Sequence, residues 1–143
     1  MPRKKIQKKV TTVREHPLLD PDVVKALIDS ESDFRADPRE NKKAFGITQI
    51  TPKTLKIVQD PKGEAKDFIF NKITQKDLKK SGIAIPMGIR WLLRKRATAM
   101  NQLKRAPDHE ELILEYKGLL KSNSKYKDAA LGKYKEAYAK LKE

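Results

Sequence analysis

Glu31 is the residue whose place in the sequence most favours acid–base chemistry. It lies four residues after Leu27 and three after Ile28, so a helix through this region places its carboxyl group beside an apolar stripe. A carboxylate on a core-facing stripe costs free energy unless it is paired or protonated, and a general acid needs the protonated form near neutral pH. The alternative is that the helix frays at residues 30–32 and that Glu31 simply reaches solvent.

Residues 45–52, with the sequence FGITQITP, form a second segment that could contact a ligand. A glycine at a loop-to-helix junction lets the backbone come close to a bound molecule. Gln49 offers both a donor and an acceptor, which is the chemistry that binds sugar hydroxyl and N-acetyl groups. The same residue types also occur in ordinary turns, so this run alone does not define a site.

Composition excludes several other kinds of site. The chain of 143 residues contains no cysteine, which excludes disulfides, zinc–thiolate centres and thiol nucleophiles. His16 and His109 are too far apart in the sequence to suggest a metal cluster, so no metal and no cofactor is expected. No apolar run approaches the ~20 residues that a membrane span needs, and no apolar stretch of a secretory signal follows the basic N-terminus.

The elements that must position these residues are helical, and the apolar periodicity predicts an all-α domain with one core. Asp20-Pro21-Asp22 starts a helix, because Asp20 can cap it and Pro21 suits its first position. Further helices are predicted at 51–60, 64–80, 85–104, 108–120 and 126–142, and the helix at 108–120 opens with a capping box. The apolar side of the helix at 85–104 is expected to consist of Ile85, Ile89, Leu92, Leu93, Met100 and Leu103.

The chain is strongly basic, with 33 Lys and Arg against 19 Asp and Glu and a formal net charge of +14. A basic arm is predicted over residues 1–16, followed by a single domain over residues 17–143. Residues 17–60, which contain both candidate segments, carry seven basic and eight acidic residues and are therefore near-neutral. A chain with this charge is expected to bind a polyanion.

Taken together, the segments ALIDSESDF (26–34) and FGITQITPKT (45–54) resemble the signature of the lysozyme-like soluble lytic transglycosylases. That signature is Glu-Ser-x-Phe followed by Gly-Leu-Met-Gln-x-x-Pro-x-Thr, with the glycine fifteen and the glutamine eighteen residues after the glutamate. Glu31, Gly46 and Gln49 keep both distances, and Pro52 and Thr54 also match. The likeness extends over roughly residues 17–118.

The resemblance implies a lysozyme-like fold of the goose-type or lytic transglycosylase kind. It also implies cleavage of the β-1,4 bond between N-acetylmuramic acid and N-acetylglucosamine in peptidoglycan. A single glutamate, here Glu31, protonates the leaving oxygen and then acts as base while the muramoyl 6-hydroxyl closes a 1,6-anhydro ring. Tyr116, the counterpart of the tyrosine in the family's Ala-Tyr-Asn motif, is expected near Glu31. The positions that the resemblance assigns to substrate binding are Ser32, Glu40, Ile47, Thr48, Gln49, Thr51 and Tyr116.

Several positions depart from the family pattern. Glu40 replaces a serine, Thr51 replaces a methionine, and Lys117 replaces the asparagine after the tyrosine. Glu40 has the largest consequence, because an extra carboxylate near Glu31 could activate water and make the enzyme a hydrolytic muramidase. Glu40 could equally be a solvated loop charge.

The expected partners are peptidoglycan glycan strands, together with anionic cell-wall polymers or the outer-membrane surface. We expect a monomer that binds no nucleic acid and acts as a phage-type lysin or virion component, in the periplasm or on the wall after release. The rival is a non-enzymatic, helical nucleic-acid-binding module. In that case the arm at 1–9 and the basic residues Arg90, Arg94, Lys95 and Arg96 would contact phosphates.

Overall fold

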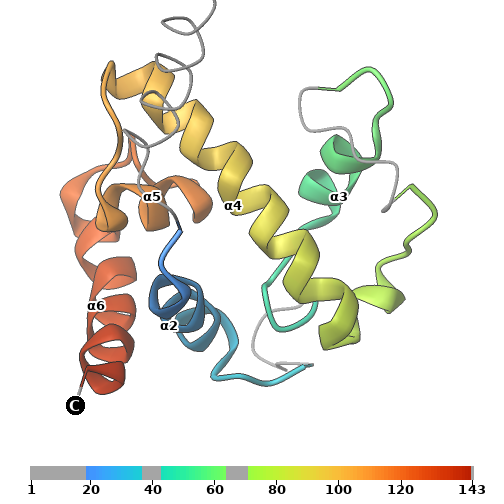
Figure 1. Ribbon diagram of the computed structural model, residues 1–143, viewed down its shortest axis with the longest axis horizontal. Helices are drawn as coiled ribbons and strands as arrows, with labels where there is room; N and C mark the ends of the chain where they lie inside the picture. The colour runs from blue at the N-terminus through green and yellow to red at the C-terminus, as the bar shows by residue number, and fades with distance from the viewer. Residues whose placement is uncertain (1–18, 37–42, 64–70, 143) are drawn as a thin grey trace, which may run out of the picture.

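The computed structural model describes residues 19–36, 43–63 and 71–142, and these residues form helices joined by loops (Figure 1). The helices are α2 (Pro21–Ser32), α3 (Pro52–Gln59), α4 (Ser81–Leu103), α5 (His109–Tyr116) and α6 (Ser124–Leu141), with a 3-10 turn η2 (Lys76–Lys79) before α4. The described residues contain no strand, and the prediction of an all-α domain is confirmed. The arm predicted at 1–16 lies outside the described residues, so the boundary at residue 17 stays a prediction.

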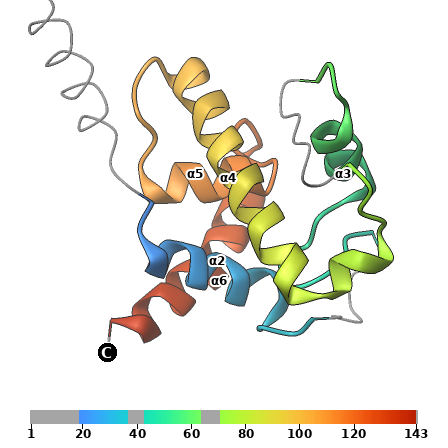
Figure 2. The ribbon, with the colours of Figure 1, turned by 45° about the vertical axis from the view of Figure 1, so that its right-hand side comes forward.

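The long helix α4 divides the described part of the molecule. Figure 1 shows α2, α5 and α6 on one side of α4, and α3 on the other. In Figure 2, α2 and α6 lie against each other, in agreement with the packing between these two helices. None of the helices in the described ranges combines the length and the apolar composition needed to cross a bilayer.

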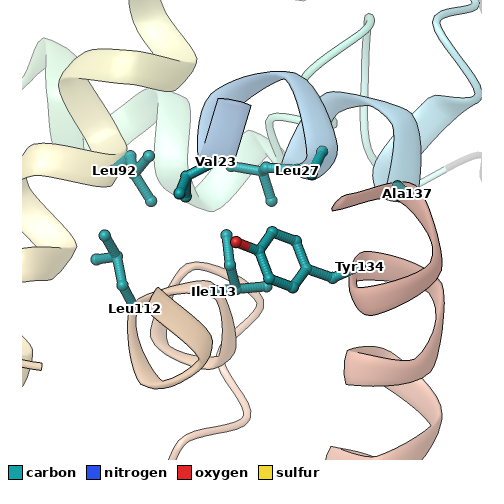
Figure 3. Close-up of a cluster of buried hydrophobic side chains, with 8 residues drawn as sticks. Val23, Leu27, Leu92, Leu112, Ile113, Tyr134 and Ala137 are labelled. Carbon is teal, nitrogen blue, oxygen red and sulfur yellow. The ribbon is translucent and has the colours of Figure 1, made fainter. Parts of the chain in front are cut away.

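The first core cluster lies where α2, α4, α5 and α6 meet. Figure 3 shows its side chains pointing toward one another from the four helices. Its buried members are Val23, Ala26, Leu27, Leu92, Leu112, Ile113, Tyr134 and Ala137. Because burial of a Val, Leu or Ile side chain contributes about 1.5–3 kcal/mol, this cluster is a principal source of stability for the end of α2 that precedes Glu31.

A second cluster fills the space between α4, α3 and η2, and a third joins α2 to α4. The second consists of Ile50, Leu55, Val58, Leu78, Met87 and Trp91. The third is small and consists of Ile28, Ile47 and Ala84. The prediction of one core is therefore wrong, because α4 and the loop before α3 separate the buried side chains into three clusters.

The predicted apolar face of α4 is correct only in part, because Leu92 is buried and Ile85 packs against the third cluster, but other predicted members are not buried. The buried residues of α4 are Ala84, Met87, Gly88, Trp91, Leu92 and Ala99, whereas Leu93 is exposed. Two small residues on this face, Ala84 and Gly88, lie against the 45–50 segment, where Thr48 contacts both. Large apolar residues alone did not reveal which side faces inward.

Two predicted helix boundaries differ from the structure. Among the described residues 71–80, only η2 is helical, and α4 begins at Ser81, before the predicted start at residue 85. The helix predicted to reach residue 120 ends at Tyr116, because Gly118 adopts a φ of +76° that closes the helix.

The start of α5 matches the capping-box prediction. Asp108 Oδ1 accepts a hydrogen bond from the Glu111 amide at 2.8 Å, and Glu111 Oε1 accepts one from the Asp108 amide at 3.0 Å. Arg105 donates two further hydrogen bonds to the Glu111 carboxylate, each 2.7 Å long. These bonds, with that from Arg105 contributing most, lower the pKa of Glu111 to about 2.

Replacing Glu111 by Gln tests the contribution of this cap. A carboxyl whose pKa is lowered on folding stabilises the fold above its unfolded pKa, and that stabilisation is lost as the pH falls through its folded pKa. We expect E111Q to lower the free energy of unfolding at pH 7 by about 1 kcal/mol, with the difference shrinking between the ordinary pKa of 4.5 and about 2. Urea unfolding at several pH values measures both quantities.

Glu110 is the matched control, because it lies next to Glu111 and its 3.4 Å ion pair with Lys135 is solvent-exposed. E110Q is expected to change the free energy of unfolding by less than about 0.5 kcal/mol. Equal effects of E110Q and E111Q would show that the capping box contributes nothing specific.

Candidate active site

Glu31 lies in the last turn of α2, and the helix does not fray there. Helical structure continues through Ser32, and the Asp33 amide still donates a 2.8 Å hydrogen bond to the Asp29 carbonyl. The chain then turns sharply, because Asp33 and Phe34 have φ angles of +52° and +60°. The Glu31 side chain retains 17% of its exposure, so its carboxyl group is partly withdrawn from water.

Lys117 forms an ion pair with Glu31. Lys117 Nζ lies 2.8 Å from Glu31 Oε1 and 3.3 Å from Ser30 Oγ, and the lysine side chain is only 12% exposed. Sequence reasoning noted Lys117 only as a departure from the family pattern. No spacing along the chain could reveal this contact, because 86 residues separate the two partners.

Ser32 connects α2 to the 45–50 segment. Its hydroxyl lies 2.7 Å from the carbonyl oxygen of Ile47 and 3.0 Å from that of Ile28, and its side chain is buried. The residues that follow Glu31 and Gly46 in the two sequence segments are therefore in direct contact. The hydroxyl is directed at protein carbonyl groups.

The 45–50 segment is a tight turn closed by Phe45 and Ile50. The backbones of these two residues exchange two hydrogen bonds of 2.9 and 3.0 Å. Gly46 has a φ of +77°, and a Cβ placed on it would lie 1.8 Å from the Leu78 carbonyl oxygen. Only glycine combines this backbone conformation with so close an approach, which explains why the motif begins with it.

Thr48 and Gln49 are buried in this turn. Thr48 Oγ1 donates a 2.8 Å hydrogen bond to the Ala84 carbonyl of α4. The side-chain amide of Gln49 donates one of 2.9 Å to the Gly46 carbonyl. Gly88 leaves room for Thr48, whose Cγ2 lies 2.6 Å from the place of a Cβ on that glycine. Like their neighbour Ile47, which is also buried, these residues hold the turn against α4.

Tyr116 joins the end of α5 to the same turn. Its hydroxyl donates a 2.7 Å hydrogen bond to the Thr48 carbonyl. Burial, followed by the negative charge of Glu31, raises the pKa of the Tyr116 phenol far above its ordinary value. Tyr116 therefore stays protonated and remains a donor over the whole working pH range.

The two remaining positions that were predicted to bind substrate are Thr51 and Glu40. Thr51 is the N-cap of α3, where its Oγ1 accepts a 3.1 Å hydrogen bond from the Thr54 amide. Glu40 lies outside the described residues. The structure thus brings Glu31, Ser32 and the turn of residues 47–49 together with Tyr116, and it gives Thr51 a capping position.

A hollow of about 260 Å³ lies beside Glu31, between the end of α2 and α6. Its lining residues from α2 and the turn that follows are Asp29, Ser30, Glu31, Ser32 and Asp33, and those from α6 are Lys133, Glu136, Ala137 and Lys140. Sequence reasoning missed the α6 residues. Their spacing shows that they share a helix face, but it does not show what that face covers.

This geometry leaves one carboxyl oxygen of Glu31 available for proton transfer. Oε1 is held by Lys117, whereas Oε2 has no hydrogen-bond partner among the described residues. Because Glu31 is among the lining residues of the hollow, its carboxyl group can give a proton to a group bound there and take one back. In the part of the chain that the structure describes, no three potential metal ligands lie together.

A family model for the transglycosylase SLT domain matches residues 11–137, which span the chain from before α2 into α6. The chain belongs to the transglycosylase SLT family. The lysozyme-like, all-helical domain predicted from the two sequence segments is therefore confirmed, and activity of the family is of the peptidoglycan lytic transglycosylase type. No curated protein and no solved structure gives a significant match to the chain.

Replacing Gly46 by Ala tests the close packing of the turn at residues 45–50. The added Cβ meets a backbone carbonyl and the positive φ disfavours an L side chain, so we expect G46A to lower the free energy of unfolding by more than about 2 kcal/mol. Urea unfolding measures the loss.

Gly132 is the matched control, because it lies in α6 and a Cβ placed on it would meet nothing within 4 Å. We expect G132A to be neutral or to stabilise by up to about 1 kcal/mol. A G46A variant as stable as the wild type would contradict the packing described for the turn.

Proposed function

We propose that this protein cleaves the β-1,4 bond between N-acetylmuramic acid and N-acetylglucosamine in peptidoglycan, with Glu31 as its single acid and base. The observation that carries the proposal is the position of Glu31. Its partly buried carboxyl lines a hollow, at a helix end that Ser32 ties to the family's glycine–glutamine turn. The peptidoglycan substrate follows from family membership.

The proposed reaction uses one carboxyl group twice. Protonated Glu31 gives its proton to the glycosidic oxygen, and the bond between that oxygen and C1 of the muramic acid breaks. The resulting carboxylate then removes the proton of the muramoyl 6-hydroxyl, whose oxygen forms the new bond to C1. The product is a 1,6-anhydro ring, Glu31 regains its proton, and no water is consumed.

Hydrolysis is the second candidate outcome, because further carboxylates line the same hollow. Asp29, Asp33 and Glu136 accompany Glu31 there. An inverting glycosidase needs a second carboxylate about 6.5–9.5 Å from the acid to activate water. Glu40, the residue that sequence reasoning considered for this role, lies outside the described residues.

The basic residues of α4 favour an enzyme over a nucleic-acid-binding module. Arg90, Arg94, Lys95 and Arg96 are only partly exposed. Lys95 Nζ lies 4.6 Å from the Trp91 ring centroid and 3.9 Å from Glu115 Oε1, so its charge interacts within the fold. A phosphate-binding helix presents its cations freely to solvent, which these side chains do not.

Digestion of purified peptidoglycan, followed by mass analysis of the soluble fragments, tests the proposed function. We expect anhydro-muramoyl fragments, which are lighter by one water than the products of hydrolysis. E31Q keeps the shape of the side chain but removes the proton donor, so fragment release should fall at least ~100-fold. Because E31Q leaves the mostly buried Lys117 without its carboxylate partner, some loss of stability is expected, and thermal unfolding checks that the variant is folded at the assay temperature.

The same digest separates the alternatives. Reducing-end muramic acid as the main product would replace the transglycosylase proposal by hydrolysis, and D33N and E136Q would then identify the second carboxylate. Release of fragments by E31Q at close to the wild-type rate would show that Glu31 is not the acid.

We propose that the net charge of +14 draws the protein to anionic wall polymers or to the outer-membrane surface. We also propose that the protein acts there as a monomer, as a lysin of the phage type. Salt screens long-range attraction but not a local proton transfer. We expect lysis of whole cells to weaken between about 50 and 300 mM NaCl, while cleavage of short, uncharged glycan fragments changes little. Equal salt sensitivity of the two substrates would contradict wall targeting by charge.

A further inference from the structure

Lys117 is held in place by the way α5 ends. The Gly118 amide donates a 3.0 Å hydrogen bond to the Glu115 carbonyl, and the Leu119 amide donates one of 2.8 Å to the Leu114 carbonyl. With Gly118 at a φ of +76°, these two bonds form the Schellman ending of a helix. Lys117 is the capping residue of this ending, so its backbone is fixed relative to α5.

The side chain of Lys117 reaches from this fixed point to Glu31. Its ammonium group contacts Oε1 of the carboxylate at 2.8 Å and the Ser30 hydroxyl at 3.3 Å. Both charged side chains are mostly buried, so water screens the pair less than it screens a surface ion pair. The pair therefore places a positive charge directly against the carboxyl group that is proposed to give up and regain the proton.

Other charged groups around Glu31 come from two elements. Asp29 and Asp33 belong to α2 and the turn after it, and the hollow also receives Lys133, Glu136 and Lys140 from α6. Among the described residues, only Lys117 forms an ion pair with Glu31.

We propose that Lys117 is a positioning residue for Glu31, which orients the carboxyl group through Oε1 and holds a positive charge beside it while the proton leaves and returns. The proposal rests on the function proposed above. The first half of that reaction needs protonated Glu31 and the second half needs the carboxylate. The charge of Lys117 therefore assists the step in which the Glu31 carboxylate is needed. At higher pH it limits the fraction of enzyme whose Glu31 can donate a proton to the glycosidic oxygen.

The first test compares pH–rate profiles of the wild type with those of K117M and K117R on soluble peptidoglycan fragments. K117M lacks the positive charge beside Glu31. The ratio of its kcat to the kcat of the wild type should therefore increase with pH. We expect an increase of about tenfold between about pH 5 and about pH 8, the usual scale for a neighbouring opposite charge. K117R keeps the charge and should follow the wild-type profile.

K142M is the matched control. Lys142 also forms a 2.8 Å ion pair, with Asp22 at the opposite end of α2, so this variant loses the same charge far from the hollow. Its rate relative to the wild type should not depend on pH. A ratio for K117M that is constant with pH would reduce Lys117 to a structural contact and overturn the proposal.

The second test measures Glu31 directly and does not depend on activity. In protein labelled with ¹³C at the glutamate carboxyl carbon, the Glu31 signal is the one that E31Q lacks. That signal should titrate at higher pH in K117M than in the wild type, and equal titration in both would overturn the proposal. Should K117M fail to fold, K117N, which carries the residue of the family pattern, replaces it. If the wild-type protein cleaves no peptidoglycan and the Glu31 signal still titrates at higher pH in K117M than in the wild type, only the proposed function has failed.

Discussion

The candidate active site depends on one constraint, which is that the buried 45–50 turn must have its backbone carbonyl groups hydrogen-bonded. Water does not reach these groups, and an unpaired buried carbonyl costs about 1–3 kcal/mol. The Ser32 hydroxyl donates a hydrogen bond to the carbonyl of Ile47, and the Tyr116 hydroxyl donates one to the carbonyl of Thr48. The Gln49 side chain donates one to the carbonyl of Gly46. Two of these donors lie on different helices, so satisfying the turn also fixes α2 and α5 relative to each other.

The same constraint explains how α4 takes part. The turn lies on the small-residue face of this helix, where Ala84 accepts a hydrogen bond from Thr48 and Gly88 leaves room for its side chain. Thr48 replaces the methionine of the family pattern, and a methionine could not donate this bond. The departure is thus accompanied by a polar contact that ties the turn to α4.

The end of α5 carries two neighbouring residues with different tasks. Tyr116 holds the turn through its hydroxyl, and Lys117 holds Glu31 through its ammonium group. Because the Schellman ending fixes both backbones, the glycine that ends the helix controls the geometry of the turn and of the acid together. A change at Gly118 would therefore reach Glu31 although that glycine does not touch it.

The sequence by itself determined the family, the helical class, the caps of α2 and α5, and the fifteen-residue spacing from Glu31 to Gly46. These features follow from local rules of capping and periodicity and from a motif with fixed spacing. Only the tertiary structure decided that Thr48 and Gln49 are buried, that the core is divided in three, and that Lys117 contacts Glu31. The physical reason is that each of these depends on which elements pack together, and partners as far apart as 36 and 86 residues leave no periodic trace in the chain.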